Sequence, residues 1–83
     1  MTENVKNELI NLAKSTFEDL DYILFRKMMN KSNHHLRLYL SEKLELYEIT
    51  FEVNKDNEVL KKQIDMIDKM LDLVINELEI NEK

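Results

Sequence analysis

The sequence predicts an all-α protein: a three-helix up-down bundle, made of a long helical hairpin plus a third helix, that assembles as a dimer or higher oligomer. Its 83 residues include neither glycine nor proline, although tight turns between strands depend on glycine for positive φ. Asparagines, which tolerate left-handed turns, cluster near 30–33 and near 54–57. In the three segments that these breaks delimit, apolar residues recur at the three- and four-residue steps of a helix. A chain of this length forms one domain at most, over residues 1–83.

The first segment is expected to be one long helix over about residues 3–29, with Thr2 as its N-cap. Residues 15–18 have the form of a capping box, which is an alternative start for a second helix. Because no helix-breaking residue precedes the box, one continuous helix is the prediction. Its apolar face consists of Ile10, Ala13, Phe17, Leu20, Leu24 and Met28.

The second segment, about residues 34–53, allows two interpretations. As a helix it places Leu36, Leu40, Leu44, Tyr47 and Phe51 on one face. Residues 47–54, however, alternate apolar and polar side chains, which is typical of a strand. A helix is favoured because the sequence offers no second strand for pairing within the chain, and a strand would have to pair across a dimer.

The third segment, about residues 57–80 with Asp56 as its cap, has the most regular pattern. Its apolar residues follow the 4-3 spacing of a heptad seam, which predicts a self-association surface. A second apolar flank on segments two and three supports the same expectation of a homo-oligomer. The residues of the seam are Leu60, Ile64, Ile67, Leu71, Val74 and Leu78.

The composition argues against catalysis and against a cofactor or metal. There is no cysteine for a thiol nucleophile or thiolate ligand and no glycine for a phosphate-binding loop. His34 and His35 are adjacent, so on a helix they diverge by roughly 100° and lack the spacing of a metal-binding pair. Asp65, Asp68 and Asp72 share a helix face that we interpret as solvated. We therefore expect neither catalytic residues nor metal ligands.

The chain is also expected to be soluble and cytoplasmic. No apolar stretch approaches the roughly 18 residues that a membrane span needs. The first residues are acidic and lack the basic region and apolar run of a signal peptide. The net charge of −5 bears on solubility more than on function.

Residues 60–73, which contain two Ile-Asp steps, resemble the opening helix of the helical chorismate mutases. The resemblance covers less than a quarter of the chain. The position of the family's catalytic arginine is occupied here by Lys61, and a heptad with aspartates on its outer face gives the same pattern. We therefore derive no mutase activity from it.

A basic turn is the most distinctive feature of the charge distribution. The 20 residues from Tyr22 to Ser41 contain four Lys or Arg and no acidic residue, whereas the rest of the chain carries 8 basic and 17 acidic residues. We expect the turn to contact an acidic partner, most simply another protein, because arginine suits bidentate carboxylate or phosphate contacts. Its residues are Arg26, Lys27, Lys31, His34, His35 and Arg37.

The sequence thus favours a small non-enzymatic protein-binding regulator or inhibitor, such as an adaptor, an antitoxin-like protein or a phage-type accessory protein. It would act through a helical face and the basic turn. One alternative is a nucleic-acid-binding protein that uses the cluster from Arg26 to Arg37 on phosphates. Another is a purely structural, self-assembling helical bundle.

Overall fold

The computed structural model describes residues 1–81, and within that range the chain is built from helices alone. Its elements are α1 (Glu3–Thr16), α2 (Asp19–Lys31), α3 (Asn33–Glu52) and α4 (Glu58–Asn81). The all-α class is therefore confirmed. The predicted number of three helices is wrong, because the first segment is divided into α1 and α2.

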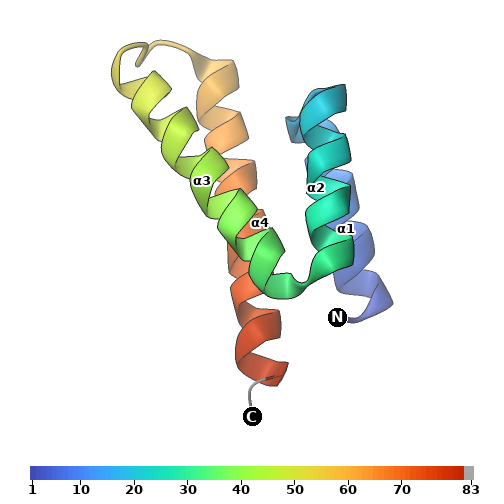
Figure 1. Ribbon diagram of the computed structural model, residues 1–83. Helices are drawn as coiled ribbons and strands as arrows, with labels where there is room; N and C mark the ends of the chain where they lie inside the picture. Colours follow the sequence, from blue (N-terminus) through green and yellow to red (C-terminus); the bar gives the residue numbers. More distant parts are fainter. Residues whose placement is uncertain (82–83) are drawn as a thin grey trace.

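The helices alternate in direction and form two layers (Figure 1). One layer holds α2 and α3, which diverge from the turn that joins them, and the other holds α1 and α4. Helix α4 lies between α1 and α3 and packs on both, while α2 packs mainly on α3. The far end of the α3–α4 hairpin extends beyond the other two helices (Figure 1), so the molecule is elongated, 41 × 25 × 18 Å.

The core is centred where all four helices meet. Each helix contributes its apolar stripe, and three aromatic rings lie together in the middle: Phe17 packs 6.1 Å from both Phe25 and Tyr39, centroid to centroid. The buried members of this core are Leu9, Ala13, Phe17, Phe25, Leu36, Leu40, Ile67, Met70, Val74 and Leu78.

The break between α1 and α2 corrects the predicted long helix. Phe17 adopts an extended conformation (φ −99°, ψ 146°), which ends α1 and carries its ring into the aromatic core. The carbonyl of Thr16 is satisfied from outside its own helix, because the side-chain amide of Gln63 donates to it at 3.2 Å. Helix α2 then starts after Glu18, whose side chain makes no capping bond, so the start lies beyond the capping box at 15–18.

The turn between α2 and α3 lies where the asparagine cluster predicts, but its geometry is different. Within residues 1–81 no residue has positive φ, so no asparagine adopts the left-handed conformation. Ser32 instead makes the break in an extended conformation. It ends α2 by donating its N–H to the Met28 carbonyl (3.2 Å) and starts α3 by accepting the N–H of His35 on its hydroxyl (3.1 Å).

The other helix ends agree with the sequence to within one residue. Thr2 caps α1, accepting the N–H of Val5 at 3.3 Å, as predicted. The cap of α4 is Asn57, which accepts the N–H of Leu60 at 3.0 Å, rather than Asp56. Residues 47–52 continue helix α3, so the helical interpretation of the ambiguous segment is confirmed and the strand is excluded.

Candidate interaction surface

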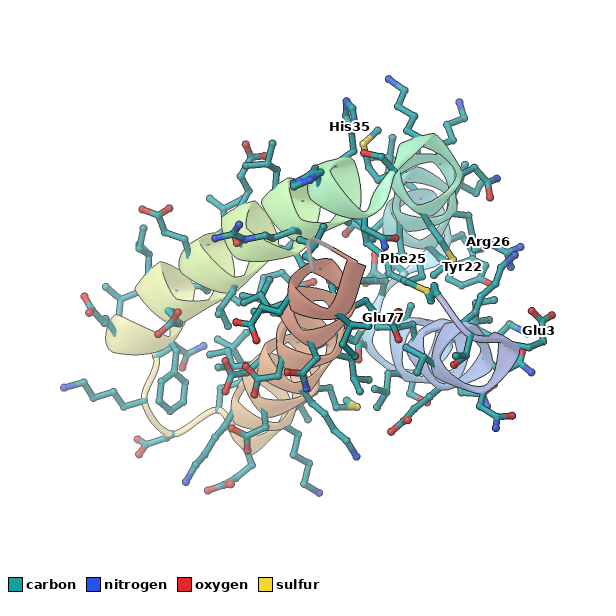
Figure 2. All side chains as sticks on the ribbon, turned by 90° about the horizontal axis from the view of Figure 1, so that it is seen from below. Glu3, Tyr22, Phe25, Arg26, His35 and Glu77 are labelled. Carbon is teal, nitrogen blue, oxygen red and sulfur yellow. The ribbon has the colours of Figure 1, made fainter. Side chains whose placement is uncertain are left out.

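The structure separates Arg26 from the rest of the predicted basic turn. Arg26 is half-buried, and its Nη1 donates to the Tyr22 hydroxyl at 3.1 Å. Figure 2 shows both side chains on the side of α2 that faces α1, whereas His35 projects from the edge of the α2–α3 layer that is turned away from α1. The prediction of one contiguous basic surface is therefore wrong for Arg26. Positions 22 and 26 are one helical turn apart, and this stripe of α2 packs against α1.

The other five basic residues are exposed and lie around the turn. Lys27 and Lys31, one helical turn apart, lie on the outer side of α2, while His34, His35 and Arg37 lie on the first turns of α3. His35 also has a structural role, since its Nδ1 is 2.7 Å from the hydroxyl of the capping Ser32. Consecutive residues diverge by about 100° on a helix, so Arg37 points away from His35 and the positive charge encircles the turn.

The outer side of α3 carries a row of exposed apolar residues that the sequence analysis did not identify as a site. Leu38, Leu46, Ile49 and Val53 are 64, 57, 56 and 86% exposed. These positions are spaced by eight, three and four residues, so they share one face. The alternation of apolar and polar residues over 47–54 was the sequence pattern that indicated the distal part of this row. Tyr47 and Phe51 turn inward, and Ile49 and Val53 turn outward. On a helix, residues two apart point in nearly opposite directions.

The α2 side of this surface is apolar as well. Leu20 is 70% exposed, and Ile23 and Leu24 are exposed beside it. Leu20 and Leu24 were predicted to lie on the packed face of one long helix. The break at 17–18 restarts the helix in a new orientation and leaves them outside. A groove runs between α2 and α3 here, lined by Leu24, Met28, His35, Leu38, Tyr39 and Glu42.

The heptad seam of α4 is used within the chain. Leu60, Ile67, Val74 and Leu78 are buried, and Ile64 and Leu71 are half-buried. One face of α4 packs on α3 and another on α1, so the neighbours that the two apolar flanks require are supplied by the chain itself. Self-association stays a prediction, and the buried residues of this seam are occupied by contacts within the chain.

A polar link joins α2 to the middle of α3 at the edge of the groove. Lys43 Nζ lies 2.8 Å from Asp21 Oδ1, and the Tyr39 hydroxyl donates to the Asp21 carbonyl at 3.0 Å. Burial raises the pKa of Tyr39, and the negative charge of Asp21 raises it further. Burial, then Asp21, raises the pKa of Tyr47 in the same way. Both tyrosines are therefore neutral at physiological pH.

Within residues 1–81, no three histidine or carboxylate side chains come together in a way that could hold a metal ion. Asp65, Asp68 and Asp72 are all exposed on the outer side of α4. No helix in this part of the chain has both the length and the apolar composition to span a bilayer.

Comparison of the chain with protein-family models, curated proteins and solved structures gives no match. Function is therefore inferred from the exposed surface of α2 and α3. We name two parts of this surface by their distance from the α2–α3 turn. The proximal face consists of Leu20, Ile23, Leu24 and Leu38 with the charged residues around them, and the distal face consists of Leu46, Ile49, Val53 and the neighbouring glutamates of α3.

Proposed function

We propose that this chain is a non-catalytic protein-binding regulator that holds a basic amphipathic helix of its partner on the distal face. The observation that carries the proposal is the exposed apolar row on the outer side of α3. Three large apolar residues within eight positions, each more than half exposed, are a hydrophobic patch of the kind that marks an interaction site.

The charge of the distal face favours a basic partner. Residues 44–54 contain three glutamates, Glu45, Glu48 and Glu52, and no lysine, arginine or histidine. The preceding Lys43 is engaged with Asp21, so it does not neutralise these glutamates. An apolar row edged by exposed carboxylates complements a helix with apolar anchors and flanking lysines or arginines.

The shape of the distal face agrees with a helical partner. A hollow on the outer side of α3 is lined by Glu42, Glu45, Leu46 and Ile49, and so combines apolar walls with two carboxylates. Anchoring side chains of a bound helix recur every three or four residues, which matches the spacing of Leu46, Ile49 and Val53. The dispersal of the basic residues around the turn favours a protein partner over the nucleic-acid alternative, which requires them along one face.

Site-specific cross-linking tests this function. A photo-reactive residue in place of Ile49 should capture one protein from the cell of origin, and the cross-linked peptide should be a basic amphipathic segment. The same photo-reactive residue in place of Asp68, exposed on α4, serves as the control and should not capture that protein. A captured segment that is acidic, or equal capture at both positions, would contradict the proposal.

Binding of the captured segment, as a synthetic peptide, then measures the contribution of the face. The double variant Leu46→Ser/Ile49→Ser should bind at least tenfold more weakly, because it removes two exposed anchors without touching the core. The control variant Val59→Ser removes an exposed apolar residue of α4 outside the distal face, and it should bind normally. Equal affinity of the double variant and the original protein would refute this role of the distal face.

A further inference from the structure

The proximal face has a charge gradient along its length. On α2, Glu18 and Asp19 lie at the start and Lys27 and Lys31 at the end, and all four side chains are exposed. At 1.5 Å per residue the two charged ends are about 16 Å apart. Between them lie the exposed apolar residues Leu20, Ile23 and Leu24. Read along α2, the surface is therefore acidic, then apolar, then basic.

Helix α3 has the same gradient in space. It runs antiparallel to α2, so its first turns, with His34, His35 and Arg37, lie at the same end as Lys31 (Figure 1). The exposed Glu42 and Glu45 follow towards the acidic end of α2. The pair of Asp21 with Lys43 shows that the start of α2 is level with this part of α3. The whole proximal face is thus positive at the turn and negative at its opposite end.

The stability of the individual helices explains the order of charges in α2 but not the order in α3. Carboxylates at the start and lysines at the end of α2 complement its macrodipole. In α3 the order is the reverse, because no acidic residue lies in its first turn and no basic residue in its last. Charges that oppose the macrodipole lower the stability of an isolated helix. A contact between the proximal face and a binding partner would give these charges of α3 a role other than stabilising their own helix.

We propose that the proximal face is covered by a second copy of this chain, related by a two-fold axis that crosses α2 near Leu24. A two-fold contact places the same patch on both sides, so the patch must complement itself. Rotation about this axis puts Lys27 and Lys31 of each copy opposite Glu18 and Asp19 of the other. The apolar residues Leu20, Ile23 and Leu24 of the two copies meet in the centre.

The same rotation pairs the basic start of α3 with acidic residues of the second copy's α3. His35, which lines the groove near the turn, comes to the level of Glu42, which lines the groove further along α3. The distal face continues beyond this contact, since α3 is longer than α2. The inference therefore goes beyond the proposed function and does not depend on it: the acidic partner of the basic turn is another copy of the chain.

A charge-swap experiment tests the proposal with the whole chain. Sedimentation equilibrium should give a dimer for the original protein at micromolar to high micromolar concentration. The variant Lys27→Glu/Lys31→Glu has an acidic α2, and the variant Glu18→Lys/Asp19→Lys has a basic one. Each alone should dimerise at least tenfold more weakly because like charges face each other. An equimolar mixture should form the heterodimer at least tenfold more tightly than either variant forms a homodimer.

Controls distinguish loss of the dimer contact from unfolding and from loss of partner binding at the distal face. Circular dichroism of each variant must show the helix content of the original protein, and recovery in the mixture itself requires that both variants are folded. Lys61→Glu/Lys62→Glu, which reverses two exposed charges of α4, should leave the dimer intact. The distal variant Leu46→Ser/Ile49→Ser should also remain dimeric, so a failure of the proposed function is distinguishable from a failure of this inference. A monomeric original protein, or a mixture that does not associate, would overturn the proposal.

Discussion

The two ends of α3 differ in how many helices surround them. Near the turn, α3 lies within the four-helix core, and Leu36 and Leu40 are fully buried. Beyond Tyr47 it extends past α2 and packs on α4, and its inward residues Tyr47 and Phe51 are only half-buried. The apolar pattern of α3 is the same at both ends. Burial of the inward-facing residues along one helix therefore depends on the number of neighbouring elements, and it is less complete at the distal end, where fewer helices cover α3.

Truncation of an aromatic residue should cost more stability at the proximal end than at the distal end. Phe25→Ala removes a fully buried ring that packs on Phe17 and Tyr22, so we expect unfolding to become easier by about 3–5 kcal/mol. Phe51→Ala removes a half-buried ring at the distal end and should cost less than half as much. Urea unfolding followed by circular dichroism measures both. Equal losses would mean that the distal end is as tightly packed as the proximal one.

Alkaline pH should destabilise the link between α2 and α3. The pKa of Tyr39 is raised in the folded state from its ordinary 10.0, so its contribution to stability is complete below pH 10 and is lost as the pH rises. The loss of the Tyr39 contribution should lower the free energy of unfolding by at most about 1.4 kcal/mol per pH unit above pH 10, and by less because solvent screens the half-buried ring.

Urea unfolding at a series of pH values compares the original protein with Tyr39→Phe. The free energy of unfolding of the variant should fall less steeply with pH. Of the two tyrosines with a raised pKa, only Tyr47 remains in the variant. Identical slopes in the two proteins would contradict the assignment to Tyr39.

Removal of a helix cap should have different effects at the α2–α3 turn and at the distal turn. Ser32→Ala deletes the hydroxyl that caps α3 and lies beside His35 Nδ1, which should cost about 1 kcal/mol of stability. Asn57→Ala deletes the cap of α4 at the distal turn. Hydrogen exchange should show that Ser32→Ala lowers protection throughout the four-helix core, whereas Asn57→Ala affects mainly the distal turn. The reverse pattern would show that the distal turn controls the fold.

The smallest expected effect concerns the ion pair of Asp21 with Lys43. Both side chains are about a quarter exposed, so we expect a coupling free energy of about 0.5–1 kcal/mol. A double-mutant cycle with Asp21→Asn and Lys43→Met measures it, and the coupling should weaken in high salt. A coupling of zero would leave the Tyr39 hydroxyl as the main polar link between α2 and the middle of α3.

Much of the secondary structure was predictable because it depends on neighbours in sequence. The lack of glycine and proline excluded a fold rich in tight turns, and the breaks near residue 32 and near 54–57 followed from short polar residues. The cap at Thr2 needed only a hydroxyl in front of a helical pattern. The candidate surface was predictable in part: the basic turn was recognised, while Ile49 and Val53 of the apolar row lay within an alternation typical of a strand.

Three features follow from the sequence because they depend on backbone propensity and periodicity within a few residues: the helical class, the positions of two turns and the apolar stripes. The end of α1 at Thr16 depends on tertiary packing, because the break is compensated by Gln63 of α4 and by the rings of Phe25 and Tyr39 around Phe17. That break turned Leu20 outward. The packing of α4 between α1 and α3 likewise placed the heptad seam in the core, because the side on which an apolar stripe is buried depends on which helices lie beside it.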